Sequence, residues 1–340
     1  MVATVISTFA GCGGSSLGYQ LAGYRELLAV EWDDTAVETF RLNFPEVPVY
    51  HGDITALTGE KCLELAGGIE VGELDVLDGS PPCQGFSTAG KRRFNDPRNS
   101  LFIEYARLLR ELQPKAFVME NVTGMVKGCM KQAYLAIIAE LRGCGYKAIG
   151  QVLNAMYYNV PQSRQRVIII GVRNDLGIEP SHPKPRTKPM SAGQAIRGIL
   201  NDPGELAWLI ECGKKYVAYQ NWPDMPVGTS RQDLGLSGFN CQKWDPKKPA
   251  QTVMKNDGHI TMHGAMHWAE RRRFTVAEFK RFASFPDSFL FAGGYKAVEY
   301  IGNSVPPNLM RAIAEHIRDR ILAGVADEVD EGAPLFAETA

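Results

Sequence analysis

Short apolar runs alternate with helical periods through the first half of the chain. Runs bounded by glycine or by polar residues predict buried strands at 4–9, 27–30, 49–51, 116–119, 147–153 and 166–172. Between them, apolar residues at helical spacing predict helices, one from Ser100 to Pro114 and one from Tyr134 to Gly143. The last two strands are expected to form a hairpin. This alternation favours an α/β fold with a doubly wound, mostly parallel sheet.

The rhythm is lost after residue 174, where proline, glycine and scattered aromatic residues predominate. Further on, Thr275 and Glu278 have the spacing of a capping box at a helix start. The last predicted helix carries Leu309, Ile313 and Ile317 on one face, which is expected to return to the first core. We therefore expect a main domain of residues 1–173 and 300–322, a smaller and irregular mixed domain of residues 174–299, and an acidic tail of residues 323–340.

Composition excludes several classes of protein for this chain of 340 residues. There is no basic leader and no apolar run of about 18 residues, so we expect an unsecreted, cytoplasmic protein. The seven cysteines form no CxxC pair, which argues against a disulfide framework or a zinc site. His259, His263 and His267 are spaced four apart, but Gly258 and Gly264 argue against a helix that would align them, and no metal is expected.

The formal net charge of −1 hides an uneven distribution. Residues 321–340 hold five acids and no Lys or Arg, which leaves +4 on the rest of the chain. Basic residues cluster at Lys91, Arg92 and Arg93, at Lys184, Arg186 and Lys188, at Lys243, Lys247 and Lys248, and at Arg271, Arg272 and Arg273. One such cluster is ordinarily a solvated face, whereas four on a weakly charged chain indicate an anionic partner.

A glycine loop follows the first predicted strand. Gly11, Cys12, Gly13 and Gly14 lead into a helix near Ser15, which is the arrangement of a nucleotide cradle, but Ser16 stands where the NAD fingerprint requires glycine.

Residues at the next two strand ends suit the same ligand. Glu31 lies 20 residues after Gly11, at the usual distance for an acid that binds a ribose. Trp32 offers a face to a purine, and Asp53 a polar contact. A tight turn with solvated acids would give the same pattern.

The stretch DVLDGSPPCQGFS, residues 75–87, places Cys83 after a short strand and two prolines that fix the backbone. A thiol at the carboxyl end of a strand is a candidate nucleophile, and a structural cysteine in a proline-rich turn is the other interpretation. Glu120 follows an adjacent strand and can face Cys83. Arg164 and Arg166 alternate at a strand mouth and suit an anionic or carbonyl-bearing substrate, or are exposed edge charges.

Together these blocks resemble the DNA (cytosine-5) methyltransferase family, from Phe9 to about Ile317. The resemblance is carried by FAGCGGSSLG at 9–18, EW at 31–32, DI at 53–54, SPPCQGFS at 80–87, ENV at 120–122, QSRQR at 162–166, RFTVAEFKRFASFPD at 273–287 and GNSVPPN at 302–308. The chain departs from the family pattern at Ser7 and Thr8, where an acid often precedes the phenylalanine.

The resemblance implies a sheet that binds S-adenosylmethionine, released as S-adenosylhomocysteine, and a target-recognition domain at 174–299. It implies methyl transfer to C5 of a cytosine flipped out of duplex DNA, through a covalent bond from Cys83 to C6. Glu120 would act at N3 and the exocyclic amine, and Arg164 would bind the base carbonyl and keep Glu120 in position. Gln84, Asn121 and Arg166 complete the implied catalytic set.

The resemblance also implies the remaining contacts. The cofactor residues would be Phe9, Ala10, Gly11, Cys12, Gly13, Gly14, Glu31, Trp32, Asp53, Ile54, Pro82, Leu101, Asn303 and Ser304. The DNA-contacting residues would be Ser87, Lys91, Arg92, Arg93, Gln162, Arg231 and Lys243. The restriction-modification type adds a cognate restriction endonuclease as a candidate partner and predicts a monomer.

Four other interpretations fit the sequence less well. A tRNA-methylating branch of the same fold is the nearest, although Gln84 resembles the DNA type. Amino-group methylases carry an aromatic residue where Cys83 stands. A non-catalytic binding module is expected to lack Cys83 or Glu120. An NAD-dependent oxidoreductase has no use for Cys83, Glu120 and Arg164 together.

Overall fold

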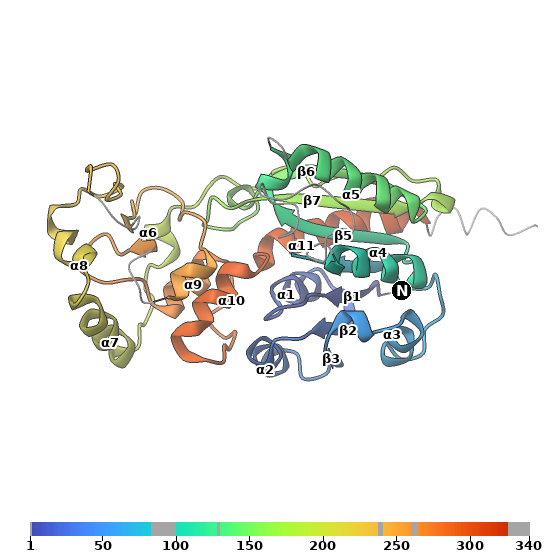
Figure 1. The fold of residues 1–340 in the computed structure, drawn as a ribbon, viewed down its shortest axis with the longest axis horizontal. Helices are drawn as coiled ribbons and strands as arrows, with labels where there is room; N and C mark the ends of the chain where they lie inside the picture. Colours follow the sequence, from blue (N-terminus) through green and yellow to red (C-terminus); the bar gives the residue numbers. More distant parts are fainter. Residues whose placement is uncertain (1, 83–99, 128–129, 237–240, 260–263, 326–340) are drawn as a thin grey trace, which may run out of the picture.

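The computed structural model describes residues 2–82, 100–127, 130–236, 241–259 and 264–325. Figure 1 shows a larger lobe built around a sheet and a smaller lobe of short helices and irregular chain. Several predicted site residues lie outside the described ranges, namely Cys83, Gln84, Ser87, Lys91, Arg92 and Arg93, and so does most of the acidic tail.

The larger lobe contains a seven-stranded sheet in the order β3-β2-β1-β4-β5-β7-β6. The strands are β1 (Thr4–Thr8), β2 (Arg25–Glu31), β3 (Val49–His51), β4 (Val76–Gly79), β5 (Ala116–Val122), β6 (Tyr146–Asn154) and β7 (Gln165–Arg173). Among these seven strands, β7 alone runs opposite to the others, and it forms the predicted hairpin with β6. The doubly wound, mostly parallel sheet predicted from the alternating pattern is confirmed.

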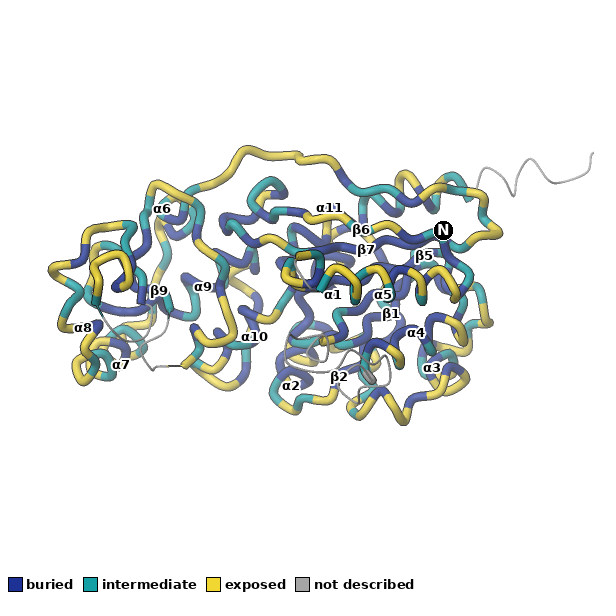
Figure 2. The backbone as a smooth tube through the Cα atoms, turned by 45° about the horizontal axis from the view of Figure 1, so that its top comes forward, coloured by how far each residue is buried: buried dark blue, intermediate teal, exposed yellow. Residues whose placement is uncertain are grey.

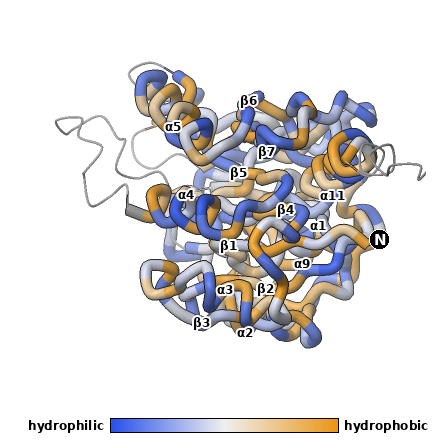
Figure 3. The backbone as a smooth tube through the Cα atoms, turned by 90° about the vertical axis from the view of Figure 1, so that its right-hand side faces the viewer, coloured by the Kyte–Doolittle hydropathy of each residue, from blue (hydrophilic) through white to orange (hydrophobic). Residues whose placement is uncertain are grey.

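Helices cover both faces of this sheet (Figure 3). One face carries α3 (Gly59–Leu65), α4 (Ser100–Leu112) and α5 (Lys131–Gly143), and the other carries α1 (Gly14–Leu21) and α11 (Pro307–Ile317). Alternate strand residues bury toward opposite faces: Ile6 and Leu77 pack with α4, whereas Val5 and Val76 pack with α11. The predicted return of Leu309, Ile313 and Ile317 to the first core is confirmed.

The smaller lobe is irregular, as the proline-rich and glycine-rich sequence predicts. Its elements are α6 (Ala192–Ala195), α7 (Pro203–Lys214), α8 (Val217–Asn221) and a two-stranded parallel pair, β8 (Cys241–Lys243) with β9 (Gly264–Met266). The chain enters it through residues 184–190, an exposed connection between the lobes (Figure 2). No helix among the described residues is both long and apolar enough to cross a membrane.

A hydrophobic cluster joins the two lobes. Helix α2 (Asp34–Asn43) contributes Phe40, and α9 (Val276–Phe282) contributes Phe279 and Phe282 to the same buried group. The predicted capping box of Thr275 and Glu278 starts α9. Helix α10 (Ala297–Asn303) follows and leads the chain back to α11, so the last segments of the sequence lie against the first.

The two described histidines of the predicted series, His259 and His267, do not lie on a common helix. His263 lies outside the described residues, and His259 follows a 3₁₀ turn, Lys255–Gly258. The ring Nδ1 of buried His267 accepts the backbone N–H groups of Ala269 and Glu270, and burial lowers the pKa of His267 to about 4. This imidazole is therefore neutral and structural near pH 7.

Candidate active site

A cavity of about 750 Å³ lies at the carboxyl ends of the parallel strands, where α/β sheets bind ligands. The predicted cofactor residues that line it are Phe9, Ala10, Gly11, Cys12, Gly14, Glu31, Trp32, Asp53, Ile54, Pro82, Leu101, Asn303 and Ser304. Gly13 does not. It is the N-cap of α1 with φ 92°, and a Cβ there would lie 2.4 Å from the Phe44 ring. Its role is to let the turn form against α2.

Glu31 holds the glycine loop against β2. Its Oε2 accepts the N–H of Gly11 at 2.7 Å, and its Oε1 accepts the N–H groups of Trp32 and Asp33 at 2.9 and 3.0 Å. The loop above it is open, because a Cβ on Gly11 would meet no atom within 4 Å. Trp32 is 75% exposed on the rim of the cavity. This geometry leaves room for a ligand over the loop and an aromatic face beside it.

The C-terminal block completes the cavity wall. The Sγ of Cys12 lies 3.0 Å from the Oγ of Ser304, and a Cβ on Gly14 would lie 2.5 Å from the carbonyl oxygen of Val305. Sequence reasoning missed five titratable residues that line the cavity, Asp33, Lys255, Lys296, Glu299 and Tyr300. The Tyr300 hydroxyl donates to Asp33 Oδ1 at 2.8 Å, a contact between residues far apart in the chain that no local motif signals.

The opposite end of the cavity is lined by Glu120 and Asn121 from β5 and by Arg166 from β7. The antiparallel register places Val122 opposite Arg166, so the arginine reaches back to Glu120. Arg166 Nε lies 2.7 Å from Glu120 Oε1, in an ion pair largely withdrawn from solvent. Asn121 Nδ2 donates to the carbonyl of Pro81 at 3.0 Å and so ties β5 to the chain that leads into Cys83.

Arg164 does not make the contact expected of it. The sequence predicted that it keeps Glu120 in position, whereas the ion pair of Glu120 is with Arg166. Arg164 is 2% exposed, and its Nη1 donates to the carbonyls of Val253 and Gly302 at 3.1 and 2.9 Å. Burial and the charge of Arg166 lower the pKa of Arg164, while Glu120 opposes them. Arg164 lines the cavity and joins β7 to the segments that follow it.

Three residues expected to contact DNA are turned inward, which contradicts that expectation for the described conformation. Gln162 is 1% exposed, donates to the Phe282 carbonyl and accepts the N–H of Val253. Lys243 is 6% exposed, with its Nζ 3.6 Å from the centre of the Trp222 ring. Arg231 is also buried. Polar groups committed to buried partners are not available to phosphates.

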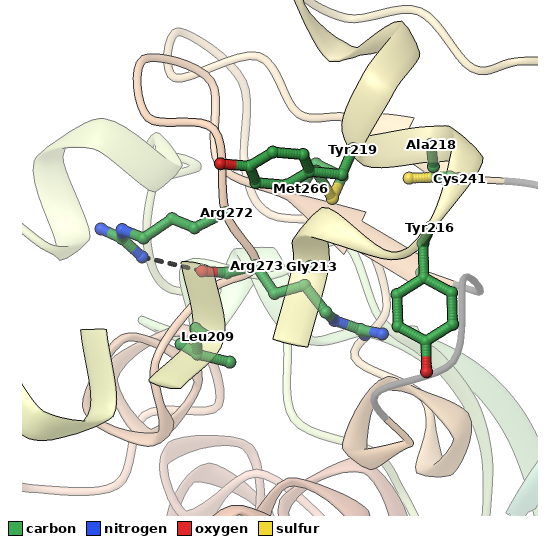
Figure 4. A pocket seen from close by; sticks show the side chains of 10 residues that line it. Leu209, Gly213, Tyr216, Ala218, Tyr219, Cys241, Met266, Arg272 and Arg273 are labelled. Carbon is green, nitrogen blue, oxygen red and sulfur yellow. Dashed lines mark hydrogen bonds between the residues drawn. The ribbon is translucent and has the colours of Figure 1, made fainter. Parts of the chain in front are cut away.

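Two arginines of the basic run at 271–273, Arg272 and Arg273, are likewise buried, whereas Arg271 is half-buried. Arg272 pairs with Glu278 at 2.8 Å, and Arg273 with Asp257 at 3.3 Å. Figure 4 shows Arg272 and Arg273 leaving the chain in different directions beside a second cavity of about 30 Å³. That volume admits one or two water molecules and no larger ligand. Lys184, Lys188, Lys247 and Lys248 remain exposed.

The cysteines among the described residues are poor candidates for a catalytic nucleophile. Burial raises the pKa of the thiols of Cys12, Cys62, Cys144 and Cys241. Thiols of this kind are inert near neutral pH, because the thiolate is the reactive form. Cys212 is half-buried on α7 in the smaller lobe and does not line the large cavity.

Comparison with known proteins gives one consistent result. Residues 3–319 match the family described as C-5 cytosine-specific DNA methylase. Type II methyltransferase M1.HphI of Haemophilus parahaemolyticus is 36% identical over 93% of this chain and 87% of its own length. Type II methyltransferase M.DdeI of Desulfomicrobium norvegicum is 32% identical over 92% and 88%.

Solved structures share the fold. A protein described as a DNA modification methyltransferase encoded within an E. coli prophage superposes with a TM-score of 0.75 at 24% identity, covering 94% of this chain and 99% of its own. The DNMT2 of Spodoptera frugiperda gives a TM-score of 0.65 at 19% identity, over 95% and 99%. With its family match, its curated relatives and this fold, the chain belongs to the C-5 cytosine-specific DNA methylases and is a DNA (cytosine-5) methyltransferase.

Proposed function

We propose that this enzyme methylates a cytosine flipped out of duplex DNA, through a covalent bond between Cys83 and C6 of the base. The observation that carries the proposal is the continuity of one cavity. It runs from the glycine loop and Glu31 at one end to Glu120 and Arg166 at the other. A methyl donor bound at the first end and a base bound at the second would therefore share one cavity and could react with each other.

The first end fits S-adenosylmethionine. The volume suits a ligand of that size, the open loop at Gly11 leaves backbone exposed to it, and Trp32 offers an aromatic face to the adenine. Phe9, Trp32 and Asp53 would hold the adenine, Glu31 the ribose, and the loop backbone the methionine part. When bound, this cofactor supplies an electrophilic methyl group.

The second end fits a cytosine. C5 of cytosine is a poor nucleophile until a thiolate adds to C6. The Glu120 carboxyl would hold a proton at N3 and accept from the exocyclic amine, and the Arg166 guanidinium orients that carboxyl. Arg164, fixed by two backbone carbonyls, would present its remaining donors to the base carbonyl. Proton loss from C5 and elimination of the thiolate would restore Cys83.

The nucleophile is assigned to Cys83 by its sequence context, and none of the five described cysteines is a better candidate. Four of these are buried thiols with raised pKa values, and Cys212 lies on α7 away from the cavity. The strand that leads to Cys83 ends at Gly79, and Pro81 and Pro82 line the cavity. The described chain reaches Pro82 beside the end of the cavity that holds Glu120, where Asn121 bonds the Pro81 carbonyl.

DNA with 5-fluorocytosine at every cytosine, incubated with S-adenosylmethionine, tests the proposal because fluorine at C5 cannot leave as a cation and traps the adduct. We expect a protein–DNA adduct by mass spectrometry with wild type and none with Cys83→Ala. Cys212→Ala is the matched control and should form the adduct. An adduct on fluorinated tRNA but not on DNA, or one that persists in Cys83→Ala, would refute the proposal.

A further inference from the structure

We propose that Asp78 is a positioning residue, whose buried carboxyl group fixes helix α1 of the cofactor loop to the strand that carries the catalytic cysteine. The inference rests on the proposed function, because it concerns the alignment of the two ends of the same cavity. Asp78 is 3% exposed on β4 and stands five residues before Cys83. It does not line the cavity, so it acts through its neighbours.

The contacts of Asp78 run between the two parts of the site. The Tyr19 hydroxyl of α1 lies 3.4 Å from Asp78 Oδ1, and Ser15 of α1 acts on the same carboxyl by lowering its pKa. Ser15 itself lines the cavity at the start of α1. The Asp78 backbone carbonyl accepts from the Thr8 hydroxyl at 2.9 Å. One residue of β4 thus bonds the helix that follows the glycine loop and the strand that precedes it.

The register explains why a carboxyl stands at this position. Ser7 on β1 lies directly beside Asp78 on β4, and both side chains are buried. Ser7 and Thr8 are the positions at which the sequence departs from the family pattern by lacking an acid. Asp78 therefore supplies a carboxyl group in the layer under α1 from β4, the strand next to the one that holds Ser7. Glu26 on β2 extends this layer and accepts from the Ser16 hydroxyl at 2.9 Å.

The surroundings of Asp78 favour a neutral carboxyl. Burial, together with Glu26 and Glu120, raises the pKa of Asp78 to about 8, against the opposing effects of Ser15 and Tyr19. Among the described residues, the titratable groups that act on it are Tyr19 from α1, Glu26 from β2, Glu120 from β5 and Tyr105 from α4. All of these are acids or phenols.

A protonated Asp78 adds no negative charge beneath Glu120. As pH rises through about 8, ionisation would place an unpaired charge in this layer and weaken the alignment of α1 with β4. We therefore expect the rate of methyl transfer to fall as pH rises through about 8, because the Asp78 carboxyl group ionises there. Asparagine has the same shape and stays neutral, so Asp78→Asn should not show the loss.

The experiment compares Asp78→Asn, Asp78→Ala and the double variant Ser7→Asp with Asp78→Ala. The readouts are the thermal midpoint, the Kd for S-adenosylmethionine and the single-turnover methylation rate from pH 6 to 9. We expect Asp78→Asn to keep its rate within threefold at pH 7 and to lose the alkaline decline. We expect Asp78→Ala to lose at least tenfold in rate while still folding, and the double variant to recover at least threefold.

Asp75→Asn is the matched control. Asp75 precedes the same strand, binds Lys115 and the Thr4 backbone, and lies at the end of β4 away from the cavity. The Asp75→Asn variant should have a lower thermal midpoint and an unchanged methylation rate. A rate in Asp78→Ala within threefold of wild type would overturn the inference.

If Asp78→Ala fails to fold, the pH profile of Asp78→Asn still tests the inference. An alkaline decline in Asp78→Asn identical to that of wild type would also overturn it. Absence of methyl transfer by wild type on DNA would instead reject the proposed function, so the two failures are distinguishable.

Discussion

The hydrogen bond from Asn121 to Pro81 supports the strongest prediction about catalysis. It joins the end of β5 to the chain just before Cys83, over 3.0 Å between two buried groups. Asn121→Ala leaves the Pro81 carbonyl buried without this donor, at a cost of about 1–3 kcal/mol. If this cost raises the activation free energy of methyl transfer by displacing Cys83, the methylation rate drops by about 5- to 150-fold, since about 1.4 kcal/mol corresponds to a tenfold change in rate.

The assay is single-turnover methylation of duplex DNA, together with the Kd for S-adenosylmethionine and the free energy of unfolding. Asn121→Asp should be slower than Asn121→Ala, because a carboxylate oxygen would face the Pro81 carbonyl oxygen. Asn43→Ala is the control. It removes bonds to the carbonyls of Thr39 and Leu290 outside the cavity and should change stability alone. A rate for Asn121→Ala within twofold of wild type would refute the reasoning.

Three further changes test the packing, the buried acids and the cofactor site. Gly302→Ala would bring a Cβ within 2.4 Å of the Met254 carbonyl carbon, so urea unfolding should show a loss of about 1–3 kcal/mol; no loss would contradict the contact. Burial raises the pKa of Glu26 to about 7, so the folded state holds a proton that the unfolded state releases above about 4.5. The free energy of unfolding should then fall by about 2–3 kcal/mol from pH 4.5 to 7, and Glu26→Gln should flatten that fall. Trp32→Ala should weaken S-adenosylmethionine binding by about 1–3 kcal/mol in calorimetry and leave the thermal midpoint unchanged, and an unaltered Kd would exclude stacking on this ring.

Local rules account for what the sequence predicted correctly. A strand followed by glycine and a helix places its loop at the carboxyl edge of the sheet, wherever the rest of the chain goes. Gly11 and Asp53 follow β1 and β3, Glu31 ends β2, and all three line the cavity. The capping box at Thr275 is equally local, because its two partners are three residues apart.

Tertiary partners account for the errors. Lysine is usually solvated, and nothing near Lys243 in the sequence shows that Trp222 covers it. Arg164 and Arg166 point to the same side of the chain, so spacing alone could not decide which one meets Glu120. The antiparallel register of β7 against β5 decides it in favour of Arg166. Tyr300 was missed because Asp33, its partner, is distant in sequence.

The contact of Cys12 with Ser304 has a consequence for biosynthesis. Residues 9–14 leave the ribosome early, but the wall they share with residues 303–305 can form only when nearly the whole chain has been translated. A nascent chain therefore has half a cofactor cavity for most of its synthesis. A truncated translation product that ends before α10 would lack residues 303–305 and with them this wall of the cavity, so we expect it to be inactive.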